Sequence, residues 1–349
     1  MGRPARLTAS VVVATHSAER INLVKRCVDS LCDGTLMPNE TIVVVDSNPS
    51  VEASLREELA EKALVVANRG SGASEARNTG LALATSDIVA YLDDDADPEA
   101  DWLEAVIAAF ERRPTTVGVG GRVVPEYELG SRPLPPEVLW IVGCTYRGHR
   151  SDEGPISRPI GANMAFRASA VSRVGGFPSA FGPNAARRTP ARHGSAGKKT
   201  SAPDRRPLAP GWLERGHRAA GSNEELALAV TLRREFGDEC LHYCPSACVK
   251  HFVPRARLTA RYLVSRCWVE GTTKADVTAL HGRAAMSDDQ RYLLHVLLPG
   301  IGRRLLTGSR HRDRSALLEA LVLAAAAQVT AAGYVTRTLA YALPRPGRC

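Results

Sequence analysis

The chain has 349 residues, and its 44% apolar fraction excludes a disordered polypeptide and predicts a globular protein, long enough for one large domain and an appendage. The net charge of +8 is uneven, because residues 183–220 hold nine lysines and arginines against two acids and residues 250–349 hold sixteen against six. The rest of the chain is therefore acidic, and the positive C-terminal third suits a diphosphate or an anionic membrane as well as it suits DNA.

The first residues run straight into a predicted strand, with no apolar segment typical of a secretory signal. Together with eight cysteines, this predicts a cytoplasmic protein with reduced thiols and no disulfides. Cys240, Cys244 and Cys248 lie close in sequence to His242 and His251, which raises a zinc site as one interpretation. Their spacing matches no common zinc motif, so buried or half-buried thiols are favoured.

Apolar, β-branched runs alternate with segments of helical period over the first hundred residues. The predicted elements in chain order are strand 8–14, helix 18–31, strand 41–45, helix 51–60, strand 64–67, helix 74–84 and strand 88–92. Such a βαβ series predicts an α/β fold with a mostly parallel, twisted sheet flanked by helices. Ligands of such sheets bind beyond the carboxyl ends of the strands.

Polar residues follow each of the four predicted strands. They are Thr15 and His16, then Asp46, then the loop Arg69–Arg77, then the triplet Asp93–Asp95. Asp46 and the three residues after it would, taken alone, be typical of an Asx turn. Four polar clusters at one edge of a sheet instead favour a ligand site.

The aspartate triplet predicts a divalent-metal site. Carboxylates crowded at a strand end repel one another unless a hard cation binds them, and Mg²⁺ or Mn²⁺ takes such oxygens together with substrate phosphates. The alternative is a solvated turn. We favour that alternative for Asp97, because Asp97 and Pro98 before Trp102 are typical of a helix N-cap followed by proline at the first helical position.

Seven segments form an ordered series along the chain: Ser10–Thr15, Ile42–Asp46, Ala76–Gly80, Tyr91–Ala96, Gly161–Arg167, Val174–Phe177 and Asn223–Leu228. Their order and spacing resemble those of the family 2 glycosyltransferases, which have the Rossmann-like GT-A fold. The resemblance covers roughly residues 8–275 with one interruption. Two more segments, Val142–Gly148 and Arg266–Gly271, resemble an actinobacterial branch of that family.

The resemblance implies a donor site for a nucleotide diphosphate sugar. Asp46 would accept a hydrogen bond from the base, the backbone around Thr15 would support the nucleoside, and Arg77 would lie near the nucleotide. Asp93 or Asp94 would face the ribose or the sugar.

The resemblance also implies a metal held against the donor diphosphate. Asp95 is the first choice of ligand and Asp93 the second. A metal there stabilises the charge that develops on the departing nucleoside diphosphate. Relatives often place a metal-binding histidine where His251 ends a strand-like run, although a lone histidine is as well explained as a packing residue.

Glu224 and Glu225 supply the candidate general base. An inverting transferase needs a carboxylate opposite the leaving group to take the proton of the acceptor hydroxyl, and we assign this role to Glu225. Many relatives carry aspartate there, so the side chain is one methylene longer here. The alternative is a helix N-terminus capped by Ser222 or Asn223, where each acid adds only ~0.3–1 kcal/mol.

Residues 183–220 interrupt the resemblance. The segment has few large apolar residues and predicts a disordered basic insertion. It would be a lid for a phosphorylated acceptor, a tolerated surface insertion, or damage that leaves the enzyme inactive. The surface insertion is favoured, because a longer loop adds little closure entropy.

The domain division predicted here is a GT-A domain over residues 1–275 and a helical basic region over residues 276–349. Residues 316–335 are rich in alanine and leucine, but Glu319 interrupts them and residues 303–314 are strongly basic. This pattern favours a packing helix or a membrane-surface helix over a transmembrane span.

The predicted function is inverting, metal-dependent transfer of a sugar from a nucleotide diphosphate sugar, by default a UDP-sugar, to a hydroxyl acceptor. The acceptor would be a glycan, a glycolipid or a natural product, as in polysaccharide biosynthesis, and a lipid-linked acceptor is one of the alternatives. The expected location is the cytoplasm, with peripheral contact at the inner face of the cell membrane. The alternatives are a catalytically silent nucleotide-sugar-binding protein and, less favoured, a nucleic-acid binder. No nucleic-acid partner is expected, because no nucleic-acid-binding motif accompanies the charge and aromatic residues make up only 5%.

Overall fold

A computed structural model describes residues 6–178, 223–282 and 287–342, so the predicted insertion at 183–220 lies outside the described residues. The described residues form a nine-stranded sheet in the order β3-β2-β1-β4-β8-β6-β9-β5, with β7 paired to β9. The strands are β1 Ala9–Thr15, β2 Glu40–Val45, β3 Leu64–Ala67, β4 Ile88–Asp93, β5 Ala96–Pro98, β6 Gly118–Tyr127, β7 Gly154–Pro155, β8 Asn163–Arg167 and β9 Leu241–Val253.

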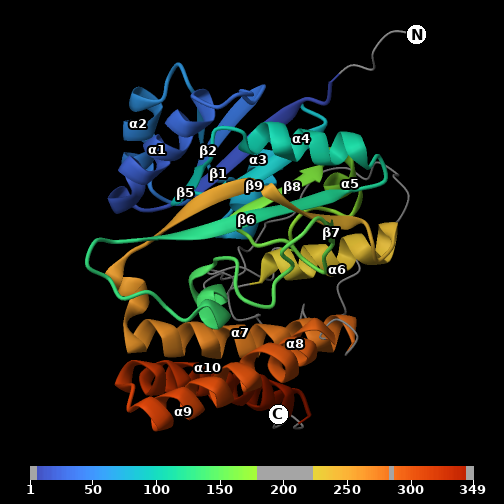
Figure 1. Cartoon of the computed structure of the whole chain (residues 1–349). Coiled ribbons are helices and arrows are strands. Elements are labelled where there is room, and N and C mark those ends of the chain that lie inside the picture. The colour runs from blue at the N-terminus through green and yellow to red at the C-terminus, as the bar shows by residue number, and fades with distance from the viewer. Residues whose placement is uncertain (1–5, 179–222, 283–286, 343–349) are drawn as a thin grey trace, which may run out of the picture.

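Helices connect these strands and form the C-terminal part of the chain (Figure 1). They are η1 Ala18–Arg20, α1 Ile21–Cys32, α2 Pro49–Glu58, α3 Ala73–Leu83, α4 Trp102–Arg112, η2 Pro136–Val142, α5 Ala168–Arg173, α6 Glu224–Phe236, η4 Arg255–Leu258, α7 Ala260–His281, α8 Ser287–Tyr292, η6 Leu293–Leu297, α9 Leu298–His311 and α10 Arg314–Ala342. The segment η6 is a π-helical turn that continues α8 into α9.

The α/β fold predicted from the alternating pattern is confirmed. Strand β1 pairs in parallel with β2 and β4, and β2 pairs in parallel with β3. Strand β8 runs antiparallel between β4 and β6, and β5 and β7 run antiparallel to β9, so the complete sheet is mixed. The four strands with polar residues at their ends are β1 to β4, and their parallel alignment brings those ends to one edge.

Alternating residues of each strand supply two separate cores. Val11 and Val13 of β1 pack with Phe110 of α4 on one face of the sheet. Val12, between them, packs with Phe166 and with Leu228 of α6 on the other face. Because both faces are covered, the central strands are apolar throughout, which is the pattern expected of a buried parallel sheet.

The predicted N-cap at Asp97 is wrong. Asp97 lies within β5, which pairs with β9 opposite Lys250, and its carboxylate accepts a hydrogen bond from the Ser30 hydroxyl. Helix α4 begins at Trp102, five residues after Asp97, with Asp101 at the N-cap position. Pairing with a distant strand therefore overrides a local capping pattern that ends in proline.

The helices α7 to α10 form a layer below the sheet in Figure 1, coloured orange to red. Helices α7 and α10 cross at very short range. A Cβ atom added to Gly271 would lie 2.0 Å from the Thr330 carbonyl oxygen, and one added to Gly333 would lie 2.6 Å from the Trp268 carbonyl oxygen. Glycine is therefore required on both helices. Helix α7 spans residue 275, and the domain division placed at that residue stays a prediction.

Hydrogen bonds to the buried carboxylate of Glu137 connect this helical layer to the rest of the protein. Glu137, on η2, is completely buried and accepts two hydrogen bonds from Arg304 of α9, both 2.9 Å long. Arg147 donates a third at 3.0 Å. Burial opposes ionisation of Glu137, but the Arg304 guanidinium holds its pKa below the usual range. Removing Arg304 would leave the buried Glu137 carboxylate with Arg147 as its cationic partner, so the loss of stability should be at most the roughly 3–5 kcal/mol that breaking a buried ion pair costs.

The seven cysteines in the described part of the chain are free thiols. Cys240 and Cys244 are buried and Cys248 is half-buried, as the interpretation as packing thiols expects. They are spread over β9 and the residue before it. The Cys244 thiol lies 3.7 Å from the Ala105 carbonyl oxygen and 3.3 Å from the Ser246 hydroxyl.

Candidate active site

A cleft of about 830 Å³ lies at the carboxyl ends of the parallel strands. It runs from the sheet to α7, α8 and η6, so the helical layer forms one of its walls. Six of the residues predicted from the sequence line it: Arg77, Asp93, Asp94, Glu224, Glu225 and His251. Thr15, Asp46 and Asp95 do not line the cleft itself.

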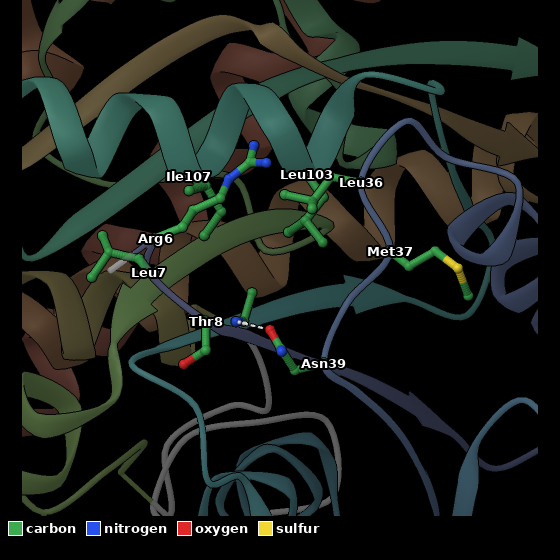
Figure 2. Close-up of a pocket in the computed structure, with 9 residues that line it drawn as sticks. Arg6, Leu7, Thr8, Leu36, Met37, Asn39, Leu103 and Ile107 are labelled. Carbon is green, nitrogen blue, oxygen red and sulfur yellow. Dashed lines mark hydrogen bonds between the residues drawn. The ribbon is translucent and has the colours of Figure 1, made fainter. Parts of the chain in front are cut away.

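A second cavity lies at the other end of β1. It has a volume of about 160 Å³ and is lined by residues that include Arg6, Met37, Asn39 and Leu103 (Figure 2). The Asn39 side chain accepts a hydrogen bond from the Ala9 amide at 2.9 Å. The cavity is lined mainly by apolar side chains and holds no acidic or histidine residue, so it offers no chemistry comparable to that of the large cleft.

The three aspartates of the triplet point in different directions. Asp94 accepts a hydrogen bond of 2.7 Å from the Thr15 hydroxyl and pairs with Arg20. Burial raises the pKa of Asp94 to about 6, although Arg20 opposes this shift. Asp94 thus links the ends of β1 and β4 beneath the cleft.

The two carboxylate oxygens of Asp95 face different partners. Its Oδ2 atom accepts a hydrogen bond of 2.8 Å from Arg257 and lies 3.3 Å from Arg20. Its Oδ1 atom lies 2.9 Å from Nε2 of His251. Both atoms of this close pair are buried, and neither completes a hydrogen bond of suitable orientation. Two buried polar atoms left in this way indicate a missing partner between them.

Asp93, Asp95 and His251 each offer a ligand atom, and these atoms lie within 4.8 Å of one another. Two adjacent ligands of an octahedral Mg²⁺ or Mn²⁺ ion lie about 3 Å apart, given bonds of about 2.1 Å. The 2.9 Å between Asp95 and His251 agrees with that value. Two carboxylates and an imidazole are also a donor set that suits Mn²⁺. The group therefore fits a divalent cation.

His251 is oriented by a second contact. Its Nδ1 atom lies 3.6 Å from the thiol of Cys144, and the thiol also contacts the Val142 carbonyl oxygen at 3.7 Å. Burial lowers the pKa of His251, but the Asp95 carboxylate outweighs burial and raises it to about 10. Without a cation, His251 and Asp95 therefore form a buried ion pair.

Arg77 connects the metal group to the acidic pair at the start of α6. It donates to Glu224 and lies 3.2 Å from Asp93, and its guanidinium carbon is 5.5 Å from the centre of the Phe177 ring. Arg77 and Glu224 are both buried. The Glu224 carboxylate is thus held by a cation and is poorly placed to accept a proton.

Glu225 is the acid of the pair that stays reactive. It is half-buried and lines the cleft. Burial, and next the neighbouring Glu224 carboxylate, raise the pKa of Glu225 to about 7. A Cβ atom added to Gly161 would lie 3.7 Å from Arg77 and 3.9 Å from the Glu225 carboxyl carbon, so only a glycine separates these two groups.

Asn223 is the N-cap residue of α6 in a left-handed conformation, with φ of 67°. Its side chain makes no capping bond and instead donates to Glu270 of α7 at 3.0 Å. Asn223 therefore does not cap the helix through its side chain, and Ser222, the other capping candidate, lies outside the described residues. A non-glycine residue in this conformation costs free energy and is found mainly where surrounding structure fixes a site.

Asp46 lies behind the cleft at the end of β2. Its carboxylate accepts hydrogen bonds from the Asn68 side chain at 2.9 Å and from the Gly72 amide at 2.8 Å. These bonds hold the loop between β3 and α3. A carboxylate has about four acceptor positions, so a nucleotide base can still donate to it.

Two asparagines of the segments that carry the resemblance, Asn163 in Gly161–Arg167 and Asn78 in Ala76–Gly80, serve the fold. The Asn163 side chain accepts from the Trp102 indole at 2.9 Å and donates to the Ala247 carbonyl at 2.8 Å, which joins β8, α4 and β9. Asn78 exchanges two hydrogen bonds of 2.8 Å with the backbone of Phe177. Their positions in the motif thus have a structural reason.

Sequence reasoning missed several residues that hold the site, among them Arg20, Arg257, Cys144, Arg158 and Glu270. Each acts on a partner far away in the sequence, so no local pattern marks it. One usable signal was position, since Arg20 and Arg257 follow Thr15 and His251 by five and six residues.

Residues 10–175 match the family model of glycosyl transferase family 2. A glucosyl-dolichyl phosphate glucuronosyltransferase from Haloferax volcanii is 34% identical over 181 residues, which are 50% of this chain and 58% of the relative. A pre-mycofactocin glycosyltransferase from Mycobacterium tuberculosis is 36% identical over 110 residues, which are 30% of this chain and 23% of the relative. The matches thus span less than two-thirds of either curated relative.

Among solved structures, the chain resembles a mannosyltransferase from Pyrobaculum calidifontis that was determined in complex with GDP-Man and Mn²⁺. The TM-score is 0.56 at 17% identity, over 95% of this chain and 88% of that one. At this identity the similarity concerns the fold alone. Residues 10–175, slightly less than half of the chain, thus match glycosyl transferase family 2, and the fold is similar to that of the solved mannosyltransferase.

Proposed function

We propose that the chain is an inverting, metal-dependent glycosyltransferase that moves a sugar from a nucleotide diphosphate sugar to a hydroxyl acceptor. One observation carries the proposal. A single cleft holds a group of residues that fits a divalent cation and, across Arg77 from it, a carboxyl group whose pKa is raised to about 7. These are the two functions that inverting transfer requires, namely support for the leaving group and removal of the acceptor proton.

Glu225 is the proposed general base. A carboxylate with a pKa near the working pH is a better proton acceptor than an ordinary glutamate and is still largely ionised above neutral pH. Because Arg77 holds Glu224, only Glu225 has a carboxylate without a cationic partner in this pair. Glu224 in turn keeps Arg77 in place and raises the pKa of Glu225 through its negative charge.

Asp93, Asp95 and His251 are the proposed ligands of Mg²⁺ or Mn²⁺. A bound divalent cation would supply Lewis-acid stabilisation of the leaving diphosphate. Arg20 and Arg257 position the Asp95 carboxylate, and Cys144 contacts the other nitrogen of His251. Such outer contacts fix the direction of ligand atoms.

The proposed donor is a UDP-sugar, with dTDP- and GDP-sugars as alternatives. Thr15, Asp46, Arg77, Asp93 and Asp94 are the proposed donor-side residues, and they occupy the ends of β1, β2 and β4 and helix α3. The solved mannosyltransferase holds GDP-Man, which supports a nucleotide sugar without deciding the base.

The proposed acceptor is a hydroxyl group of a glycan, a lipid-linked sugar or a natural product, as in polysaccharide biosynthesis. The name of the Haloferax relative, a glucosyl-dolichyl phosphate glucuronosyltransferase, supports a lipid-linked acceptor. We further propose an actinobacterial-type branch, supported by the segments Val142–Gly148 and Arg266–Gly271.

We also propose that the chain acts in the cytoplasm, with α10 lying on the inner face of the cell membrane. Among the described helices, α10 is long and apolar enough to cross a membrane by length and composition, yet only 22% of its most apolar window is buried. One face packs on α7, as the contact between Gly271 and Thr330 indicates. We call the opposite face the α10 stripe: Leu318, Leu321, Ala325, Gln328, Ala332, Val335 and Leu339, all exposed.

The α10 stripe repeats at steps of three and four residues, so it forms one continuous line on the helix. On neighbouring α9, Arg303, Leu306 and Arg310 follow at the same steps and are exposed. Arginines beside exposed leucines suit an anionic lipid surface, where apolar side chains enter the bilayer and arginines meet headgroups. This complementarity favours a bilayer over a second copy of the chain as the occupant.

The proposed function is tested by calorimetric titration of the chain with UDP, dTDP and GDP, each with Mn²⁺ and then with EDTA. We expect one nucleotide to bind in the presence of Mn²⁺ and to lose most of its affinity in EDTA, because the metal group lies beside the proposed diphosphate site. A folded chain that binds none of the three would contradict the proposal. Nucleotide binding without any sugar transfer would instead support the silent binding protein.

The membrane proposal is tested by flotation with phosphatidylcholine vesicles that contain phosphatidylglycerol. Leu321→Asp is expected to reduce binding, because it places a charge at the most exposed leucine of the α10 stripe, 64% accessible. Leu64→Asp is the matched control, since Leu64 is 54% accessible on the edge strand β3. Equal binding of both variants, or a change only in oligomeric state with Leu321→Asp, would rule out the membrane proposal.

A further inference from the structure

The cleft continues beyond Glu225 into a part that neither the metal group nor the proposed donor residues use. Arg158 lines it from the segment between β7 and β8, Arg266 and Glu270 from α7, and Arg291 from α8. We call Arg158, Arg266 and Arg291 the distal arginines. They share the cleft with Glu270, Asp288 and Asp289, of which Asp289 is paired with Lys274 at 2.6 Å.

Arg158 is incompletely paired. Its Nη2 atom reaches Glu270 only at 3.5 Å, and its Nη1 atom is buried with no hydrogen-bond partner. Glu270 itself is well satisfied, because Asn223 donates to it at 3.0 Å and Lys274 lies at 3.1 Å. A buried donor without an acceptor is costly, and in native structures it commonly marks a place where a ligand or water binds.

The other two distal arginines are also available. Arg266 is half-buried and Arg291 is exposed, and neither forms an ion pair with a carboxylate in the described part of the chain. Arg20, Arg77 and Arg257, which line the same cleft, are each paired with an aspartate or a glutamate. The distal arginines therefore differ from the cations that serve the fold of the site.

The ion pairs set the order of groups across the cleft. Asp93 pairs with Arg77, and Arg77 pairs with Glu224. On the other side of the acidic pair, Asn223 bonds to Glu270, which meets Arg158. The distal arginines thus lie on the α7 side of Glu225, and the metal group lies on the β4 side. A molecule held at Arg158 would approach the acidic pair from the α7 side, whereas the metal group lies beyond Arg77.

We propose that the distal arginines, with Arg158 at their centre, bind a phosphate group of the acceptor and so hold the acceptor hydroxyl toward Glu225. This inference rests on the proposed function and names the class of acceptor as a phosphate ester. Arginine suits the role because its planar fork donates two parallel hydrogen bonds to phosphate oxygens. Here Nη1 of Arg158 is the free donor.

The phosphate has two possible sources, a lipid headgroup or a soluble phosphorylated sugar. The rim of the cleft bears on this choice. Helix α8 and η6 present Arg291, Tyr292 and His295 to the cleft, while Leu293 and Leu294 of the same turn are exposed. An apolar chain attached to the phosphate would find these leucines beside the cleft. The experiment therefore has one arm for each source.

The experiment measures binding of the full chain, saturated with UDP and Mn²⁺, to phosphatidylcholine vesicles that carry either a polyprenyl phosphate or the neutral polyprenol. We expect a preference for the phosphate that Arg158→Gln reduces by roughly 10- to 100-fold, since charge-assisted hydrogen bonds are lost. Arg158→Lys should retain part of it. Arg261→Gln is the matched control, because Arg261 is exposed on α7 and does not line the cleft.

Soluble hexyl phosphate forms the second arm, as a competitor. If hexyl phosphate displaces the chain from polyprenyl phosphate vesicles, the phosphate group alone is recognised. If hexyl phosphate does not displace the chain and binding still depends on Arg158, the lipid-borne phosphate is the ligand. Equal binding by Arg158→Gln and Arg261→Gln, or no preference in the unchanged chain, would overturn the inference. So would loss of UDP binding in Arg158→Gln, which would assign Arg158 to the donor. Absence of UDP binding in the unchanged chain would instead refute the proposed function.

Discussion

Glu225→Gln is expected to slow sugar transfer by about 10²- to 10⁴-fold, the range that loss of a general base produces, and to leave nucleotide binding unchanged. The amide has nearly the same shape as the carboxylate but does not accept the acceptor proton. Glu225 makes no side-chain ion pair in the described part of the chain, so the substitution breaks no structural contact there. Single-turnover transfer and calorimetric titration with nucleotide and Mn²⁺ measure the two effects separately.

The pH profile gives a second readout of the same substitution. The pKa of Glu225 is raised to about 7 by burial and by Glu224. Because the base works only when it is ionised, transfer should rise with pH up to and slightly above 7 and should fall as the pH drops below it. The variant should lose this dependence. Retained transfer in Glu225→Gln, with the profile unchanged, would remove Glu225 from the mechanism.

Two matched variants separate catalysis from folding. Glu235 lies at the far end of α6 and pairs with Arg173 at the surface. The Glu235→Gln variant should therefore behave as the unchanged chain. Glu224→Gln takes the partner from buried Arg77, so it should impair stability and nucleotide binding together. Only the variant at Glu225 should separate transfer from binding.

Asp95→Ala is expected to abolish metal-dependent nucleotide binding and turnover. Loss of an outer contact to a metal ligand commonly costs 10- to 100-fold in affinity, and loss of the ligand itself should exceed that. Direct Mn²⁺ binding, followed by electron paramagnetic resonance, and nucleotide titration with and without EDTA measure the effect. Because Asp95 is buried against His251 and Arg257, a thermal melt must accompany the titration.

Asp95→Asn is the variant that keeps the shape of the side chain while it removes the charge. Asp97→Asn is the matched control, since Asp97 lies two residues away on β5 and bonds to Ser30 outside the cleft. Unchanged Mn²⁺ dependence in a folded Asp95→Asn variant would show that the metal, if required, binds elsewhere.

The first half of the fold could be predicted because its signals are local. The apolar runs at β1, β2 and β4 face cores on both sides of the sheet, and period alone separates them from the helices between. Strand β5 escaped prediction for the opposite reason. Only three residues long, it exists because it pairs with β9, more than 150 residues away, and that pairing overrode the capping pattern at Asp97.

The candidate site, too, could be predicted only in part. Asp93, Asp95 and Glu225 lie at strand or helix ends, where the sequence pattern predicts the residues of a site. The pairing that gives each a distinct role does not appear in the sequence, because it depends on side chains brought in from far along the chain. Arg77 holds Glu224 across 147 positions and Arg257 holds Asp95 across 162. Residues 183–220, predicted as a disordered insertion, lie outside the described residues, so that prediction stays open to test.

Helix α7 faces two ways. Arg266 and Glu270 line the cleft. Gly271, the next residue, packs directly against the backbone of α10 at Thr330. The C-terminal helices therefore cannot be removed without loss of contacts that support the cleft. A shortened gene that stops before α9 would uncover the glycine face and withdraw Arg304 from buried Glu137. A variant that keeps every helix and exchanges only the outward leucines of α10 for polar residues would leave both contacts in place.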